Sequence, residues 1–230
     1  MAKVKLKLLI TAGPTREAID PVRFVSNRSS GILGYTLART ARAQGHAVTL
    51  ISGPTGLPKP AGVKRIDVET ALEMETAVFK ALPKADALVM NAAVADFRPM
   101  SRARRKIKRP GVAGSLQVVE LHLIENPDIV AGAASRAKPN QVVIGFGLET
   151  ERLLGNAKRK LKSKQLDAIV ATWMPITGKA KDPFGNNVIT GAIVESGGKA
   201  VLFERLSKQV LAGRILKITE QLVMRKKVVS

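Results

Sequence analysis

Cysteine is absent from this chain of 230 residues. Its absence excludes disulfides, iron–sulfur clusters, thiolate zinc sites and a cysteine nucleophile. Aromatic residues make up only 3% of the sequence, which leaves few stacking surfaces for single-stranded nucleic acid. No apolar run approaches the roughly 18 to 20 residues of a membrane-spanning helix. The basic, then apolar N-terminus is too short for a signal peptide and predicts a first strand. We expect a cytoplasmic protein.

Acidic residues are scarce beside basic ones: 18 Asp and Glu stand against 38 Lys and Arg, which gives a net charge of +20. A charge of this size fits a nucleic-acid-binding protein or an enzyme for multiply anionic substrates. It also fits a basic surface without a local role. Binding of nucleic acid by charge alone would weaken steeply with salt.

Short apolar runs alternate with helical patterns along the chain. The runs are continuous, which is typical of parallel strands covered on both faces. This order predicts a single domain over residues 1–230 with an α/β fold. We expect a doubly wound, mostly parallel Rossmann-like sheet with helices on both faces and an added β-hairpin. The predicted strands cover 6–10, 47–51, 87–90, 142–146 and 168–171. The first predicted helix follows Gly31, and the second covers 69–82. A third helix begins with Asn126 as its N-cap and Pro127 at its first helical position, and a fourth covers 151–164.

Three segments depart from that alternation. Residues 97–114 are basic, with a proline near each end and two glycines near the second, and predict a mobile flap. Residues 187–206 predict a hairpin with a turn at Gly197 and Gly198, either as an arm or as an edge pairing of the sheet. Residues 207–223 predict a closing helix, followed by a frayed tail.

The longest polar loop, within residues 10–34, separates the first strand from its helix. Ser29, Ser30 and Gly31 stand where the helix begins, so its backbone N–H groups could bind a phosphate. A simple helix cap explains the same residues equally well. A dinucleotide cofactor needs its glycines directly after the first strand and an acid after the second. Because the second strand ends in Ser52-Gly53, a Rossmann-like NAD(P) reductase is only an alternative hypothesis.

Other candidate residues follow the later strands. Asp96 could accept hydrogen bonds from ribose hydroxyls or cap a turn. Lys160 and Lys164 are four residues apart and share a helix face; together with Lys106 they could bind an anion or belong to a solvated surface. The two histidines, at positions 46 and 122, are far apart in the sequence and suggest neither a metal cluster nor a catalytic triad.

Several motifs together resemble one family. The stretch TAGPTREAIDPVRFVSNRSSGILG is similar to the signature of the phosphopantothenate–cysteine ligases (phosphopantothenoylcysteine synthetases). The resemblance continues through NAAVADFRP, the KIK flap, ENPDIVA, VVIGFGLET, the lysine-rich helix and DPFGNNVITGAIV. These motifs keep the family order and spacing from Lys3 to Leu222, so the resemblance covers nearly the whole chain.

The resemblance implies a step of coenzyme A biosynthesis in which 4'-phosphopantothenate and L-cysteine form an amide. The ligase, which is unrelated to the ATP-grasp enzymes, would use CTP or ATP with Mg²⁺ and pass through an acyl-nucleotide, an acyl-cytidylate with CTP. Many bacterial members are fused behind a flavin-dependent decarboxylase. We expect a stand-alone ligase here, with a separate decarboxylase, no membrane partner and a homodimer in which flap and hairpin contribute to pairing.

The resemblance also implies roles for individual residues. Asn27 matches the active-site asparagine, and Arg23 matches the neighbouring arginine that holds a substrate anion or positions the loop. Lys106 is the flap lysine. The implied nucleotide contacts are Met90, Asn91, Ala92, Asp96, Lys106, Pro127, Asp128, Ile129, Val130, Phe146, Lys160 and Lys164, beside the phosphate loop Ser29, Ser30 and Gly31.

This sequence departs from the family pattern in four places. Ile32 replaces the lysine of SSGKMG, Arg105 replaces an acidic residue before the flap, and Arg109 replaces the last flap lysine. Val-Ala-Thr-Trp at residues 170–173 replaces the usual VAND. These changes bear on base specificity and on how the substrate is held. The residues that would bind metal are not identified by the sequence.

Overall fold

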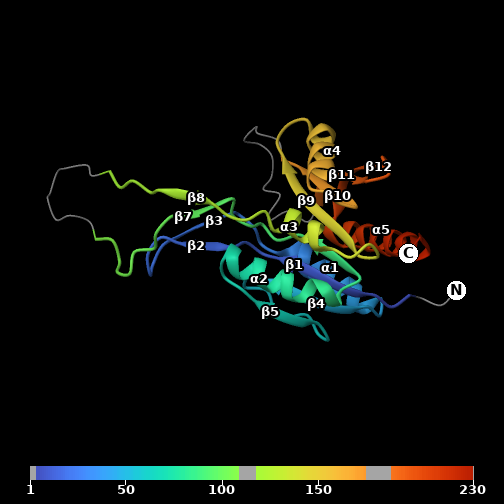
Figure 1. Cartoon of the computed structure of the whole chain (residues 1–230), viewed down its shortest axis with the longest axis horizontal. Coiled ribbons are helices and arrows are strands. Elements are labelled where there is room, and N and C mark those ends of the chain that lie inside the picture. The colour runs from blue at the N-terminus through green and yellow to red at the C-terminus, as the bar shows by residue number, and fades with distance from the viewer. Residues whose placement is uncertain (1–3, 109–117, 175–187, 230) are drawn as a thin grey trace.

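An eight-stranded sheet forms the centre of the computed structural model, which describes residues 4–108, 118–174 and 188–229 (Figure 1). The strand order is β12-β11-β10-β9-β6-β1-β4-β5. Neighbours from β10 to β5 pair in parallel, and the last two strands pair antiparallel. This confirms the predicted α/β fold. The strands are β1 (Lys7–Ala12), β4 (Ala47–Ser52), β5 (Lys64–Asp67), β6 (Ala87–Met90), β9 (Val142–Glu149), β10 (Ala168–Trp173), β11 (Val188–Glu195) and β12 (Ala200–Ser207).

Helices cover both faces of this sheet. On one face α1 (Ile32–Ala43) and α5 (Lys208–Val229) pack against Leu8 and Ile10 of β1. On the other face lie α2 (Ala71–Ala81), followed by the short 3-10 helix η1 (Leu82–Lys84), then α3 (Ile129–Arg136) and α4 (Leu153–Ser163), against Leu9. Successive strand side chains point to opposite faces, so a strand covered on both sides must be apolar throughout.

The direction of strand order reverses beside β1. From β1 the chain passes to β4 and β5 on one side, and then to β6, β9 and β10 on the other. Loops after strands on either side of such a switch point diverge, and the crevice between them is where doubly wound sheets bind ligands. The long loop that follows β1 therefore ends at the edge of the sheet where a ligand is expected.

The predicted start of the third helix is wrong. Asp128, rather than Asn126, is the N-cap of α3, and its carboxylate accepts a hydrogen bond from the backbone N–H of Ala131 at 3.1 Å. Pro127 consequently precedes the helix. The Asn126 side chain instead donates to the Ala95 carbonyl at 2.9 Å. That long-range contact removes Asn126 from capping, and local sequence does not reveal it.

Two short antiparallel ribbons extend away from the sheet, on the left of Figure 1. They pair β2 (Arg16–Ala18) with β3 (Phe24–Ser26), and β7 (Phe97–Pro99) with β8 (Leu123–Glu125). We call residues 16–26, 97–108 and 118–125 the arm. The first part of the predicted flap thus belongs to a ribbon, and residues 109–114 lie outside the described residues. The mobility of the flap stays a prediction.

The predicted hairpin is the antiparallel end of the central sheet. β11 pairs with β10 from Ala168↔Glu195 to Thr172↔Gly191, and β12 pairs with β11. Its first predicted residue, 187, lies outside the described part of the chain. Of the two alternatives, edge pairing is therefore confirmed, and a role of the hairpin in dimerisation stays a prediction.

The closing helix runs further than the sequence predicts. α5 continues to Val229, and Lys226 and Lys227 form ion pairs with Asp167 at 2.6 Å and with Asp86 at 2.9 Å. The prediction of a frayed tail is therefore wrong up to Val229. The two lysines anchor the last turns of α5 to the residues directly before β6 and β10. Within the described ranges, no helix is both long and apolar enough to cross a membrane.

Candidate active site

A cleft of about 730 Å³ opens at the carboxyl ends of the central strands. Its walls come from the loops after β1, β6 and β9, from the start of α3 and from α4. All but two of the site residues expected from the sequence line this cleft. They are Asn27, Ser29, Ser30, Gly31, Met90, Asn91, Ala92, Asp96, Pro127, Asp128, Ile129, Val130, Phe146, Lys160 and Lys164.

The start of α1 faces this cleft. Gly31 is its N-cap residue in the left-handed conformation, with φ 72°, and among the described residues no side chain caps the helix or places an acid in its first turn. The Ser29 hydroxyl accepts from the Gly31 N–H at 3.3 Å. A helix start with this arrangement has backbone N–H groups and a positive dipole end directed at the cleft. Of the two sequence interpretations, this geometry favours an anion site over a simple cap.

Asn27 joins the loop after β1 to the loop after β6. Its side-chain amide donates to the Val94 carbonyl at 2.9 Å. Two further hydrogen bonds run alongside. The Ala93 N–H donates to the Gly13 carbonyl at 2.9 Å, and the Ala95 N–H donates to the Thr15 side-chain hydroxyl at 2.9 Å. The two loops therefore form one rigid wall, with Asn27 on the cleft side and Asp96 exposed at its end.

The two predicted lysines of α4 are each held by a carboxylate. The Lys160 ammonium lies 2.7 Å from Glu149, a carboxylate with a side chain only 7% exposed, which also accepts from Asn156 at 2.9 Å. The Lys164 ammonium lies 2.8 Å from Asp128, the N-cap of α3, whose side chain is 48% exposed. Both lysines are thus oriented along one wall of the cleft.

Arg23 and Lys106 are the two expected residues that do not line the cleft. Arg23 forms an ion pair with the buried Asp20 and donates to the Ile107 carbonyl at 2.9 Å. Asp20 also accepts from the Ile107 N–H at 3.1 Å. Arg23 and Asp20 therefore clamp the described end of the flap, and exposed Lys106 stands beside that clamp.

This clamp makes stability depend on pH. The Arg23 side chain, helped by the N–H groups of Val22, Ile107 and Arg23, outweighs burial and holds the pKa of Asp20 well below its usual range. Because this pKa is lower in the folded chain, the stabilisation is complete above the ordinary carboxyl pKa of about 4. It is lost as the pH falls through the depressed folded value.

We expect Asp20→Asn to lower the thermal unfolding midpoint near pH 7 and to flatten its decline below about pH 4. Melting curves of parent and variant between pH 7 and 2.5 measure both effects. Glu151→Gln, at an exposed position, controls for the change in net charge. Parallel declines for parent and Asp20→Asn would show that the clamp contributes nothing to acid sensitivity.

Several residues of the site escaped sequence reasoning. Lys208, the first residue of α5, lines the cleft although it is only 7% exposed. Leu148 and Ile189 line it too, and Glu149 stands behind Lys160. Glu149 belongs to the motif VVIGFGLET, but nothing in that motif pointed to its contact with Lys160. Nothing local marked Lys208, because β12 and α5 reach the cleft through tertiary packing.

The carboxylates in the cleft suit a cation that is coordinated mainly by a bound phosphate compound and only partly by the protein. Within the described residues, no group of three or more His, Cys, Asp or Glu side chains could hold a metal by itself. Mg²⁺ in nucleotide sites is commonly held by one or two carboxylates together with phosphate oxygens. The exposed Asp96 and Glu125, both in the cleft lining, fit that smaller requirement.

Comparison with known families decides the relationship. The family model described as the DNA/pantothenate metabolism flavoprotein C-terminal domain matches residues 4–222. The chain belongs to this family. Membership does not favour the reductase or the nucleic-acid hypothesis, and it agrees with the resemblance seen in the sequence motifs.

Relatives of this chain include the coenzyme A biosynthesis bifunctional proteins CoaBC. The Vibrio vulnificus protein is 40% identical over 216 residues, which are 94% of this chain and 52% of that protein. The Mycobacterium tuberculosis protein is 43% identical over 220 residues, or 91% of this chain and 51% of that protein. The chain therefore spans about half the length of the curated relatives it matches.

Three solved structures share the fold. The crystal structure of the C-terminal domain of a CoaBC protein superposes with a TM-score of 0.75 at 33% identity, covering 96% of this chain and 95% of that one. The DNA/pantothenate metabolism flavoprotein from Streptococcus pneumoniae gives a TM-score of 0.75 at 22% identity over 94% and 99% of the two chains. A Cab2 mutant in complex with phosphopantothenate-cysteine gives 0.71 at 16% identity over 96% and 88%, a likeness of fold alone.

Proposed function

We propose that this chain is a phosphopantothenate–cysteine ligase that joins 4'-phosphopantothenate to L-cysteine in coenzyme A biosynthesis. The observation that carries this proposal is the cleft, which gathers the separate ligase motifs around one cavity. Family membership over residues 4–222 supports it. The site combines a helix start, two lysines and an amide side chain, which suits a nucleoside triphosphate and a reacting acyl group.

The proposed reaction needs nucleotide activation because a carboxylate is anionic and lacks a leaving group. A carboxylate oxygen of phosphopantothenate attacks the α-phosphorus of CTP or ATP, and the bond to pyrophosphate breaks. The cysteine amine then attacks the acyl carbon of this acyl-nucleotide, loses a proton to solvent and expels the nucleoside monophosphate. Charge develops first on pyrophosphate and then on the acyl oxygen, so cations and N–H donors accelerate both steps.

The described residues fit these two demands. Lys160 and Lys164 would exchange their carboxylate partners for phosphate oxygens, and the N–H groups at the start of α1 would bind the same triphosphate. Asn27 would donate to the acyl oxygen as its negative charge grows. Mg²⁺, held by Asp96 or Glu125 with the phosphates, would supply further neutralisation of the departing pyrophosphate. Asp96 would alternatively accept a hydrogen bond from a ribose hydroxyl.

Amide formation with CTP and with ATP, measured side by side, tests the proposal. We expect pyrophosphate release that requires phosphopantothenate, and an amide product once cysteine is added. Omission of each substrate in turn provides the control. If neither nucleotide supports amide formation, the assignment fails. The ratio of the two kcat/KM values also decides the preferred nucleotide.

A homodimer paired through the arm is the second part of the proposal. Exposed apolar side chains gather there, and a monomer seldom leaves a large apolar patch in water. Within the described residues each ribbon has only two strands, and the outer edges of such ribbons offer hydrogen-bonding groups to a second copy. The exposed residues are Val22, Phe24, Phe97, Met100, Val118, Val119, Leu121, Leu123 and Ile124. A cytoplasmic location completes the proposal.

We expect Leu123→Arg to convert the dimer into monomers, because a charge in the centre of the apolar arm must lose its hydration on pairing. Sedimentation velocity at micromolar concentration measures this. Leu202→Arg places the same charge on the exposed edge of the hairpin, where Leu202 is 64% exposed, and tests the contribution of the hairpin. A parent chain that sediments as a monomer, or an unchanged Leu123→Arg dimer, would contradict pairing through the arm.

A further inference from the structure

The glycines at the two ends of the loop after β1 meet each other. Gly13 and Gly31 both adopt left-handed backbone, with φ 77° and 72°. A Cβ built on Gly31 would lie 3.3 Å from the Cα of Gly13. The conformation of the helix start is therefore coupled to the end of β1. Neither glycine has a side chain that could hold this geometry, so the restraint must come from a neighbour.

That neighbour is Thr55, in the loop that follows β4. Its Cγ2 methyl would be 2.8 Å from a Cβ on Gly13 and 2.9 Å from a Cβ on Gly31. The methyl thus fills the space between the two glycines. The preceding Gly53 lies so close to Pro14 that a Cβ there would be 1.8 Å from the Pro14 carbonyl oxygen. The β4 loop packs directly against both ends of the site loop.

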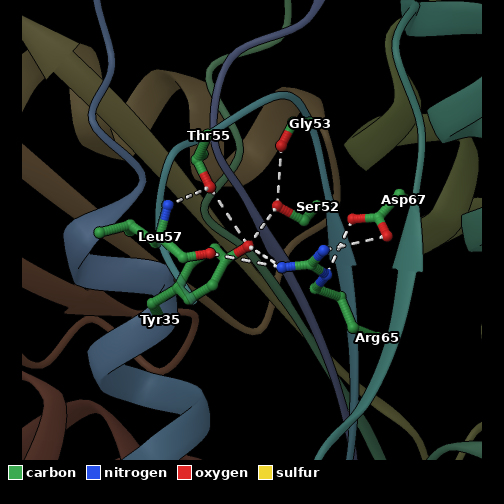
Figure 2. Close-up of polar contacts among 7 residues, drawn as sticks. All are labelled: Tyr35, Ser52, Gly53, Thr55, Leu57, Arg65 and Asp67. Carbon is green, nitrogen blue, oxygen red and sulfur yellow. Dashed lines mark hydrogen bonds and ion pairs between the residues drawn. The ribbon is translucent and has the colours of Figure 1, made fainter. Parts of the chain in front are cut away.

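A chain of hydrogen bonds holds Thr55 in place (Figure 2). Its hydroxyl donates to the Tyr35 hydroxyl at 3.2 Å and accepts from the Leu57 N–H at 3.3 Å. The Tyr35 and Ser52 hydroxyls are 2.9 Å apart, and Ser52 donates to the Gly53 carbonyl at 2.8 Å. Since Ser52 gives its proton to Gly53, Tyr35 donates to Ser52 and accepts from Thr55.

Arg65 closes this network from β5. It donates to Tyr35 and to the Leu57 carbonyl, each at 3.4 Å, and pairs with Asp67 at 2.9 Å. Tyr35 itself is only 1% exposed and belongs to the first turn of α1. Thr55 is therefore tied to the same helix whose N-cap glycine its methyl touches, and the two contacts restrain that helix start together.

We propose that Thr55 is a positioning residue for the anion site, with its methyl setting the backbone at Gly31 and Tyr35 holding the methyl in place. Neither Thr55 nor Tyr35 lines the cleft, whereas Gly31 does. The proposal rests on the proposed function, in which the start of α1 binds the nucleotide phosphates. Without the methyl, the N–H groups of that first turn lose their fixed direction toward the cleft.

Three variants separate the methyl from the hydroxyl. Thr55→Ser removes only the methyl, Thr55→Val removes only the hydroxyl, and Tyr35→Phe removes the group that holds the hydroxyl. Thr219→Ser is the matched control, because Thr219 is a fully buried threonine in α5, bonded to the Ile215 carbonyl at 2.8 Å. It loses a methyl from the core without touching the site loop.

The readout is the binding of inorganic triphosphate, monitored through the amide NMR resonances of Gly31 and Ile32. We expect Thr55→Ser to shift both free-state resonances and to raise the Kd for triphosphate about three- to tenfold, in keeping with the strength of helix-terminus interactions. Thr55→Val should stay closer to the parent, Tyr35→Phe should lie between them, and Thr219→Ser should lower only the unfolding temperature.

Parent-like resonances and affinity in Thr55→Ser would overturn the proposal, as would a larger loss in Thr55→Val than in Thr55→Ser. The resonances do not depend on turnover. If the parent formed no amide with CTP or ATP, the ligase assignment would fail, while a raised Kd for triphosphate together with shifted Gly31 resonances in Thr55→Ser would still establish the positioning role.

Discussion

Lys160→Met is expected to lower kcat/KM for the nucleotide about 100-fold and to destabilise the chain at the same time. The loss of activity follows from removing a cation that faces developing phosphate charge, worth about 2–3 kcal/mol in the transition state. The loss of stability follows from Glu149, whose buried carboxylate would keep, among the residues that the structure describes, only its hydrogen bond from Asn156. We expect about 1–3 kcal/mol, less than for a fully buried pair, because Lys160 is itself 35% exposed.

A second substitution separates these two effects. In Lys160→Met with Glu149→Gln, the buried charge is gone, so urea unfolding should return close to the parent while activity stays low. Lys164→Met serves as the matched variant, since its partner Asp128 is 48% exposed and its loss should cost less than about 1 kcal/mol. Parental kcat/KM in Lys160→Met would remove this lysine from the nucleotide site, and a double variant as unstable as the single one would refute the buried-charge argument.

The sequence predicted the centre of the sheet well because burial on two faces leaves little choice of residue. Leu8, Leu9 and Ile10 form an uninterrupted run, since alternate side chains enter opposite cores. β5 was missed for the complementary reason. Its sequence is KRID, with no fully buried residue, so an edge strand of this kind carries no apolar pattern.

The arm was missed because its strands are defined by contacts rather than by composition. Each of its four strands has three residues, too short for periodicity to show. Its attachment depends on Asp20 and Arg23, whose partner Ile107 is more than 80 residues away in the sequence. Sequence reasoning could mark the flap as basic, but it could not see what the flap rests on.

The residues of the cleft were also predicted only in part. Motif resemblance located the residues that face it, because those lie in recognisable runs after strands. Residues that support it from behind were not found: Glu149 contacts Lys160 across the gap between β9 and α4. For Arg23 the resemblance implied either a contact with a substrate anion or positioning of the loop. Its contacts with Asp20 and Ile107 favour loop positioning.

Asn27→Asp is expected to slow amide formation by about 100-fold or more, in the range found for loss of one oxyanion donor. Its carboxylate would repel the growing charge on the acyl oxygen, whereas the amide of the parent would donate to it. Activation of phosphopantothenate by the nucleotide takes place at the phosphates and should fall less. Pyrophosphate release without cysteine, compared with amide formation in its presence, measures the two steps separately.

Loss of the loop contact must be distinguished from loss of chemistry, since Asn27 also donates to the Val94 carbonyl at 2.9 Å. Asn126→Asp provides the comparison, because the Asn126 amide makes the same kind of bond to the nearby Ala95 carbonyl at 2.9 Å. Damage to this wall alone should reduce both steps in similar proportion. A selective loss of amide formation in Asn27→Asp, set against a parallel loss in Asn126→Asp, would assign Asn27 to the acyl centre; equal losses of both steps in the two variants would leave it only a structural role.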